Sequence, residues 1–183
     1  MRTILAVLLL LPIAAYAQPR PDPTKTELDQ LLTALAQSPS EDVAGRLEAR
    51  IAQLWQKSGG PTAALLLNRG ARNLGSGDAT EAVADFTAVL ALEPDLPEAF
   101  GRRAQARFQA GDIQGAIHDL EETLRREPRH FGAWRTLSLI GEEQGRPANA
   151  LQAWKKLLEV DPKTPGGATR LKQLTRLVEG EAS

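Results

Sequence analysis

The 183-residue chain contains no cysteine, one methionine, one tyrosine and two histidines. The absence of cysteine excludes disulfide bonds and thiolate metal sites, so stability must come from packing. The formal net charge is −1, from 22 basic and 23 acidic residues, and this balance lacks the basic excess that nucleic-acid binding requires. These absences fit a single soluble domain that does not bind nucleic acid.

Residues that carry catalytic chemistry are also scarce. His118 and His130 are the only histidines, they form no His-Glu-x-x-His arrangement, and we expect them at the surface and in a turn. Ser76 lies between two glycines but lacks the preceding strand that a nucleophile elbow requires. The sequence therefore predicts that the protein is not an enzyme and has no metal site and no cofactor.

What the sequence does contain is a repeat. Pro94, Pro128 and Pro162 stand 34 residues apart, and the same residue types recur at fixed distances before each of them. The recurring columns hold a glycine (Gly77, Gly111, Gly145), an alanine (Ala82, Ala116, Ala150), a bulky apolar residue (Phe86, Leu120, Trp154), a small residue (Gly70, Ala104, Ser138) and a large apolar residue (Leu66, Phe100, Trp134). A repeat of this length and composition indicates stacked helical hairpins.

On these columns the chain resembles the tetratricopeptide repeat (TPR) family over residues 63–164. The resemblance implies an all-α, helix-turn-helix (TPR-like) solenoid. Its three TPR-like repeats occupy residues 61–164, at 63–96, 97–130 and 131–164. Two columns depart from the family pattern. Arg69 and Arg103 stand where leucine is commonest, and the column that usually holds tyrosine reads Asn73, Arg107 and Gly141.

Local physical chemistry supports the hairpin interpretation. The small columns allow two antiparallel helices to approach closely, and the bulky residue four positions after each alanine fills the adjoining gap. Gly77 and Gly111 suit a left-handed residue after a helix, and Asp78 with Glu81 predicts a capping box at the next one. The three prolines are expected to end the second helix of each repeat.

Stacked repeats need covers at both ends of the stack. Leucines within residues 26–60 predict an N-terminal helical hairpin, broken at Ser38-Pro39-Ser40, which is either a degenerate repeat or an unrelated packing partner. Residues 165–183 predict a C-terminal capping helix and tail, with Thr164 as its cap and Pro165 at its first position.

The N-terminus predicts export. Residues 1–17 have the charged start, apolar core and small-x-small ending of a signal peptide, which we expect to be cleaved after Ala17. The alternative is an uncleaved membrane anchor, but the apolar run is shorter than the roughly 20 residues that span a bilayer. Residues 18–25 predict an extended spacer. We therefore expect a periplasmic or secreted protein with no stable membrane anchor after cleavage.

In the resembled family the first helices of successive repeats line a concave groove. The corresponding residues here offer groups able to hold an anion beside apolar patches, which suits a peptide with a carboxylate and one or two apolar side chains. The predicted partner-binding residues are Leu67, Asn68, Leu74, Arg102, Gln105, Phe108, Arg135 and Leu139.

Three alternatives remain for the polar part of this groove. Asn68 and Arg102 resemble part of the clamp with which some family members hold a terminal carboxylate, but Glu98 replaces an expected lysine. Arg102 and Arg135 could instead pair with neighbouring acids such as Glu98 and Glu142 on a solvated surface. The third alternative is that the groove binds an acidic or apolar peptide without such a clamp, or folds over the N-terminal segment of its own chain.

The resemblance favours an exported protein-protein interaction module, a scaffold or adaptor that binds a peptide or protein partner in its groove. The chain resembles small exported TPR proteins of Gram-negative bacteria along most of its length. The alternative is a structural accessory subunit of a cell-envelope assembly complex, in which the convex face and the capping helix matter more than the groove. Self-association is a further option for either function.

Overall fold

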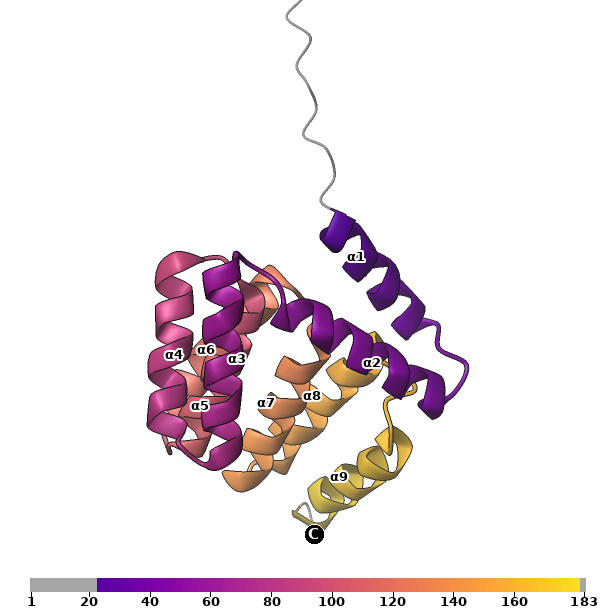
Figure 1. The fold of residues 1–183 in the computed structure, drawn as a ribbon. Helices are drawn as coiled ribbons and strands as arrows, with labels where there is room; N and C mark the ends of the chain where they lie inside the picture. The colour runs from indigo at the N-terminus through magenta and orange to yellow at the C-terminus, as the bar shows by residue number, and fades with distance from the viewer. Residues whose placement is uncertain (1–22, 182–183) are drawn as a thin grey trace, which may run out of the picture.

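The computed structural model describes residues 23–181, which form nine α-helices and no strand (Figure 1). The predicted all-α fold is confirmed. The helices are α1 (Pro23–Ala36), α2 (Glu41–Gln56), α3 (Pro61–Ser76), α4 (Ala79–Leu92), α5 (Pro97–Gln109), α6 (Ile113–Arg126), α7 (Phe131–Glu143), α8 (Pro147–Val160) and α9 (Gly167–Glu181). Each predicted repeat is one antiparallel hairpin, namely α3–α4, α5–α6 and α7–α8.

The small columns lie where the helices of a hairpin meet. All three alanines of the second helices are fully buried. A Cβ atom on Gly70 would lie only 2.7 Å from a ring carbon of Phe86, so this position requires glycine. Gly77 and Gly111 have φ of +89° and +84°, the left-handed geometry expected after a helix. The second helices end two residues before Pro94, Pro128 and Pro162.

The predicted capping box at Asp78 is not formed. Asp78 is the N-cap of α4, but its side chain makes no capping hydrogen bond and instead accepts one from Ser76 Oγ at 2.9 Å. The equivalent Asp112 does cap α6, because its Oδ1 accepts from the backbone N–H of Gly115 at 2.9 Å. The serine next to the turn therefore competes with the helix for the Asp78 carboxylate.

In the first two repeats, the residues that depart from the family pattern bind a buried aspartate. In the second repeat Asp119 accepts hydrogen bonds from Arg103 Nε and Arg107 Nη1 at 2.8 and 2.9 Å. The first repeat has the same arrangement, in which Asp85 is bound by Arg69 and by the Asn73 amide. The unusual residues of the two columns thus form one polar cluster per hairpin. The third repeat has no such cluster, since the equivalent residues are Leu137, Gly141 and Ala153.

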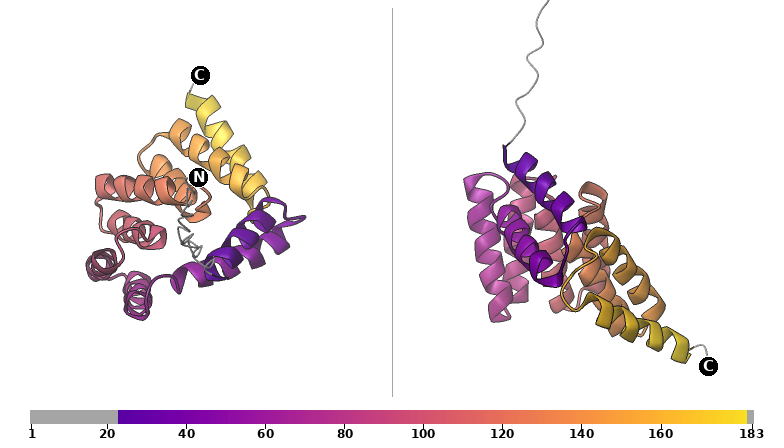
Figure 2. Two further views of the ribbon diagram at one scale, coloured as in Figure 1. Left: turned by 90° about the horizontal axis from the view of Figure 1, so that it is seen from above. Right: turned by 90° about the vertical axis from the view of Figure 1, so that its right-hand side faces the viewer.

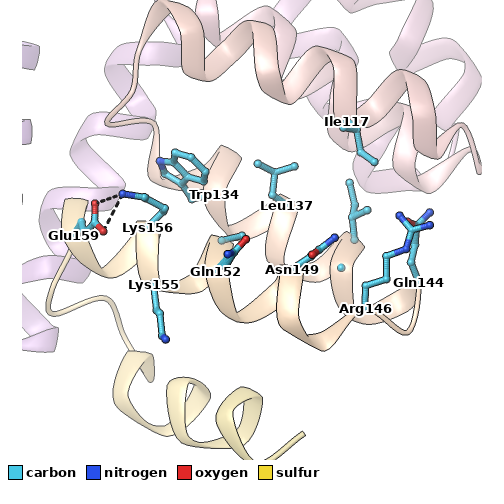
Figure 3. Close-up of a pocket in the computed structure, with 13 residues that line it drawn as sticks. Ile117, Trp134, Leu137, Gln144, Arg146, Asn149, Gln152, Lys155, Lys156 and Glu159 are labelled. Atoms are coloured by element: carbon cyan, nitrogen blue, oxygen red, sulfur yellow. Dashed lines mark hydrogen bonds and ion pairs between the residues drawn. The ribbon is translucent and has the colours of Figure 1, made fainter. Parts of the chain in front are cut away.

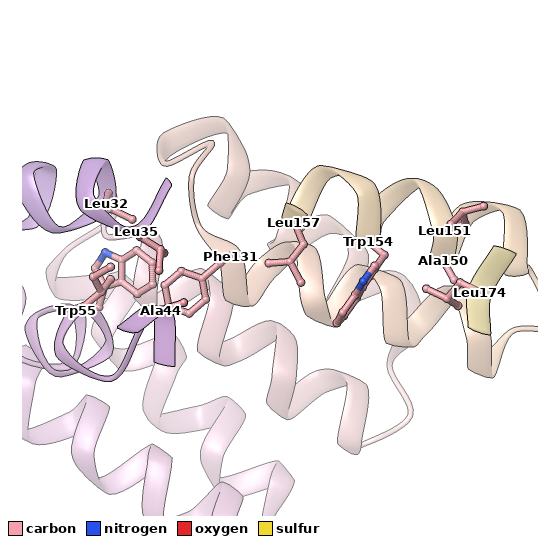
Figure 4. Packing of buried hydrophobic residues seen from close by; sticks show 11 residues of the cluster. Leu32, Leu35, Ala44, Trp55, Phe131, Ala150, Leu151, Trp154, Leu157 and Leu174 are labelled. Carbon is pink, nitrogen blue, oxygen red and sulfur yellow. The ribbon is translucent and has the colours of Figure 1, made fainter. Parts of the chain in front are cut away.

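The N-terminal hairpin folds back across the stack. Helix α2 begins beside the turn between α8 and α9 and runs toward the start of α3, while α1 contacts α8. Viewed from above, the helices form a ring that this hairpin closes (Figure 2). A continuous apolar cluster holds the closure (Figure 4), and its members are Leu32, Leu35, Ala44, Ile51, Trp55, Phe131, Ala150, Leu151, Trp154, Leu157 and Leu174.

The C-terminal helix begins later than predicted. Helix α9 starts at Gly167, because Gly166 adopts a left-handed φ of +72° that turns the chain before the helix. Thr164 is consequently buried in the interface with α2 and is not the N-cap. Leu174 of α9 is fully buried and packs into the apolar cluster.

The predicted signal peptide lies outside the described residues, as does most of the predicted spacer. The last three spacer residues, 23–25, are helical and not extended, because α1 begins at Pro23 and proline suits the first turn of a helix. Within residues 23–181, no helix combines the length and the apolar character needed to cross a membrane.

Candidate functional site

The concave face is formed by α3, α5 and α7, and α2 covers one part of it. Helix α2 lies over the N-terminal halves of α5 and α7, and a cavity of about 350 Å³ remains between them. The wall that α2 contributes includes the small side chains of Ala49 and Ala52, while the opposite wall includes Glu98, Arg102 and Phe131. The hairpin therefore narrows the concave face without filling it.

Trp55 of α2 anchors the hairpin on the repeats. Its ring stacks on His130 with centroids 4.2 Å apart and planes 4° apart. His130 Nδ1 accepts a hydrogen bond from the Ala133 N–H at 3.1 Å, so the proton of the neutral ring is on Nε2, which donates to Glu98 Oε2 at 3.1 Å. His130 is therefore the buried N-cap of α7.

Glu98 stays ionised under this aromatic stack. Burial raises the pKa of its carboxyl, but the hydrogen bond from His130 and the positive charge of Arg102 outweigh burial, and the pKa lies below its usual value. Arg102 Nε donates to Glu98 Oε1 at 2.6 Å. The pairing of Arg102 with Glu98 in the second alternative from the sequence is thus found, but the pair does not lie on a solvated surface, because Glu98 is buried.

A second anchor joins the middle of α2 to the α8–α9 turn. Arg135 Nη2 donates to Glu48 Oε1 at 2.9 Å and to Thr164 Oγ1 at 2.8 Å, and Thr164 Oγ1 donates to Glu48 Oε1 at 2.8 Å. The backbone N–H of Gly166 donates to Glu41 Oε2 at 3.1 Å. Arg135 therefore pairs with α2 and not with the predicted Glu142, which pairs with Arg170.

Asp161 lies buried beside this anchor, and within the described residues neither of its carboxylate oxygens accepts a hydrogen bond of normal geometry. Burial, a hydrogen bond with Glu48 and the negative charge of Glu48 raise its pKa to about 7. The pKa of Glu48 lies below its usual value. Burial alone would raise it, but the hydrogen bonds with Asp161, Thr164 and Arg135 and the positive charge of Arg135 outweigh burial. The two carboxyl groups therefore share one proton over much of the acidic range.

We expect this pair to make stability depend on pH. The pKa of Asp161 is higher in the folded chain than the value of about 4 for an unfolded one. The folded state therefore binds the extra proton, and the associated stability is complete below pH 4 and is lost as pH rises to about 7. Asp161→Asn should increase the free energy of unfolding at pH 8 by on the order of 3 kcal/mol, and by much less at pH 4.5. Urea unfolding across this range measures both differences.

Asp95→Asn is the matched control, because the Asp95 side chain is 91% exposed. Its stability should follow the wild-type pH profile. Parallel profiles for the wild type and Asp161→Asn would contradict the shared proton.

The C-terminal halves of α3, α5 and α7 leave the other part of the concave face open. Here a cavity of about 560 Å³ has an apolar floor of Leu74, Phe108 and Leu139. Leu139 is 44% exposed although it is a large apolar residue. Polar groups line the edges of this open cavity, namely Gln105, Gln109, Arg135, Glu142 and Arg170.

The structure brings five of the eight predicted groove residues together in the open cavity: Leu74, Gln105, Phe108, Arg135 and Leu139. The prediction of Leu67 as a groove residue is wrong, because it is 2% exposed and packs in the core of the first repeat. Asn68 Oδ1 accepts from Gln56 of α2 at 2.9 Å, and Arg102 faces the narrowed part of the groove. Of the two residues in the carboxylate-clamp alternative, Asn68 is thus bound by the hairpin and Arg102 by Glu98 of its own helix.

The residues that sequence reasoning missed all depend on long-range packing. Trp55 and Glu48 have no place in the repeat columns, and the acidic column that holds Asp161 does not distinguish it from Glu93 and Glu127, so the period carries no signal for these residues. The one sequence signal for this packing was Trp55 itself, a large aromatic residue near the end of the predicted N-terminal hairpin. The third alternative from the sequence, a groove covered by its own N-terminal segment, is confirmed for the narrowed part of the face.

Comparisons with known proteins agree with this architecture. A sequence model of the tetratricopeptide repeat family matches residues 67–119 and 102–168. A TPR repeat-containing protein of Rhizobium etli is 30% identical over 155 residues, which cover 85% of this chain and 74% of that protein. The Sgt2 TPR domain from Aspergillus fumigatus has a TM-score of 0.62 at 22% identity, and the match covers 67% of this chain and 83% of that one.

A solved complex shares the fold. The first TPR of Spaghetti (RPAP3), bound to the HSP90 peptide SRMEEVD, has a TM-score of 0.60 at 18% identity, and the match covers 64% of this chain and 94% of that one.

Proposed function

We propose a function that starts from the family: this chain belongs to the tetratricopeptide repeat family. It is a non-catalytic interaction module, and its open concave cavity binds a peptide segment of a partner protein. The observation that carries the proposal is the cavity of about 560 Å³ in which apolar side chains stay uncovered between polar edges. Sites of this size and composition suit a few side chains of a ligand.

The lining indicates which peptide would fit. Leu74, Phe108 and Leu139 would take one or two apolar side chains. The side-chain amides of Gln105 and Gln109 make no hydrogen bond to another residue of 23–181, so they are available to a peptide backbone. A peptide carboxylate could reach Arg135 or Arg170 at the edge, in competition with their present acidic partners.

A structural relative supports this choice of ligand. The TPR of RPAP3 binds an HSP90 peptide, SRMEEVD, which contains three acidic residues. We carry over only the class of ligand, a short peptide with acidic character. The hairpin across the groove of this chain changes the surface that a peptide meets, so its sequence preference is its own.

We further propose that the module acts after export, in the periplasm or outside the cell. The support is the sequence of residues 1–17, with its charged start, apolar core and Ala15-Tyr16-Ala17 ending. An exported adaptor of this kind would collect or present envelope proteins.

Site-specific photo-crosslinking tests the proposal in the native cell. A photoreactive residue at position 139 should capture a partner, and the same residue at position 65 should not, because Leu65 is 71% exposed but lies outside the cavity. Leu139→Glu should then weaken binding of the captured peptide about tenfold or more, as measured by calorimetry.

N-terminal sequencing tests export. The protein purified from the native cell should begin at Gln18, because the predicted signal peptide ends at Ala17.

Leu65→Glu is the matched control and should bind normally. Crosslinks that do not depend on position, or equal affinity of the two glutamate variants, would overturn the cavity as the binding site. A first residue other than Gln18, with the signal retained, would overturn export alone.

A second candidate function is a structural accessory subunit of a cell-envelope assembly complex. The observation that favours it is an apolar cavity of about 610 Å³ on the outer side of the third repeat. In that case crosslinks at position 139 should be absent, and the native protein should sediment with a large membrane-associated assembly.

A further inference from the structure

The outer side of the solenoid differs between its repeats. Helices α4, α6 and α8 lie on the outer side, and the gap between α4 and α6 is filled by polar side chains. Arg103 bridges it, since its Nη1 donates to Thr87 of α4 at 3.3 Å and its Nε donates to Asp119 of α6 at 2.8 Å. Arg126 covers the Phe100 ring with its guanidinium carbon 4.3 Å from the ring centroid.

The equivalent gap between α6 and α8 is open. The charged residues of the first gap are replaced 34 positions later by residues that cannot form the same ion pairs. Leu137, Gly141 and Ala153 stand for Arg103, Arg107 and Asp119, and Val160 stands for Arg126. The result is a groove of about 610 Å³ (Figure 3). We call this surface the outer groove; its floor includes Trp134, Leu137 and Ala153, and Ile117 lies on the α6 side.

The outer groove lies on the opposite face of α7 from the concave cavity. Trp134 and Leu137 line the outer groove, whereas Arg135 and Leu139 line the concave cavity. A ligand in one site therefore does not contact the other. Proposals about the two sites can fail independently.

The rim of the outer groove is basic. Its charged lining residues are Arg146, Lys155 and Lys156 against the single carboxylate of Glu159, which pairs with Lys156 at 2.8 Å. Arg146 and Lys155 have no acidic partner within residues 23–181. This excess of positive charge beside an apolar floor is complementary to a negatively charged, amphipathic partner.

The groove follows α8 from Arg146 to Glu159, which is nearly the whole of that 14-residue helix. A trough between two helices, with an apolar floor, fits the ridge of a third helix. We propose that the outer groove binds an acidic amphipathic helix of a partner protein, with its apolar stripe on Trp134 and Leu137 and its carboxylates beside Arg146 and Lys155.

A synthetic peptide tests this proposal directly. The probe is a fluorescein-labelled peptide of about 14 residues with leucine at positions i, i+4, i+7 and i+11 and glutamate beside them. The matched control peptide has lysine in place of each glutamate. The acidic peptide should bind about tenfold or more tightly than the basic one. In NMR spectra it should shift the methyl signals of Ile117 and Leu137 and leave those of Leu139 unchanged.

Two protein variants locate the binding. Leu137→Arg with Ala153→Asp builds the ion pair of the earlier repeats into the third one and should lower affinity for the acidic peptide about tenfold. Gly141 is left unchanged, because a Cβ there would lie 2.7 Å from the Ala150 nitrogen. Arg146→Glu with Lys155→Glu should reverse the preference, so that the basic peptide binds better.

Three results would overturn the proposal: equal affinity for both peptides, no binding at millimolar concentration, or undiminished binding by a folded Leu137→Arg/Ala153→Asp variant. If circular dichroism shows that this variant does not fold, the charge-reversed variant decides. An unchanged peptide preference in that variant would then overturn the proposal. Leu65→Glu, at an exposed residue outside both the outer groove and the concave cavity, should bind both peptides as the wild type does.

Discussion

Asp119→Ala should lower the free energy of unfolding by about 3–5 kcal/mol. Asp119 is fully buried, and its carboxylate accepts hydrogen bonds from Arg103 and Arg107, whose side chains are themselves largely buried. Alanine would leave two guanidinium groups in the hairpin without their shared counter-charge. Urea unfolding followed by circular dichroism at 222 nm measures the loss.

The third repeat supplies the matched control. It has Leu137 and Ala153 where the second repeat has Arg103 and Asp119, so the same hairpin geometry tolerates an apolar pair. Arg103→Leu combined with Asp119→Ala should therefore recover most of the stability lost by Asp119→Ala alone, because removing both partners leaves less uncompensated charge. A single variant that loses less than about 1 kcal/mol, or a double variant no better than the single one, would contradict this account.

Trp55→Ala should cost about 3–5 kcal/mol in the stability of the N-terminal hairpin. The indole is buried, stacks on His130 and contacts Phe131 with ring centroids 5.1 Å apart. Its removal would leave a cavity in the cluster that closes the ring and would admit water to the Glu98–His130 pair. Because each unit of a repeat array is stabilised mainly by its direct neighbours, the loss of stability should be concentrated in α1 and α2.

Hydrogen exchange distinguishes a local from a global effect of Trp55→Ala. Amide protons of α1 and α2 should lose protection, while those of α5 and α6 should keep it. Trp55→Phe is the matched control, since it preserves an aromatic face toward His130 and should lose much less protection. Equal loss of protection in all the described helices would show that the hairpin does not act as a separate closing element.

The features predicted well from the sequence are those set by neighbouring residues. Gly77 and Gly111 could be placed in left-handed turns because only a residue without a Cβ adopts that geometry at little cost. Five of the predicted groove residues meet in one cavity because helical spacing decides which side chains share a face. Leu67 was misplaced because it lies near the boundary between the groove face and the hairpin core, where spacing alone does not decide burial.

The shortfalls arise where two distant segments meet. Thr164 looked like the cap of α9 in its local context, but its hydroxyl lies between Arg135 and Glu48 in the interface with α2. Asp161 precedes a repeat-ending proline like its counterparts Glu93 and Glu127, yet only Asp161 is buried beside a second carboxylate. No local pattern encodes that difference.

The amino-acid sequence by itself determined the repeat, its period, its turns and the helices that line each face, because all of these follow from contacts between residues fewer than 34 positions apart. Only the tertiary structure decided that the N-terminal hairpin closes the ring and binds Asn68 and Arg135 of the predicted groove. It also decided that the third repeat leaves its outer side open. Both outcomes depend on which surfaces remain uncovered once the helices have packed. The hydrophobic effect is non-directional, so the positions of apolar residues in the sequence do not specify which distant segment will cover them.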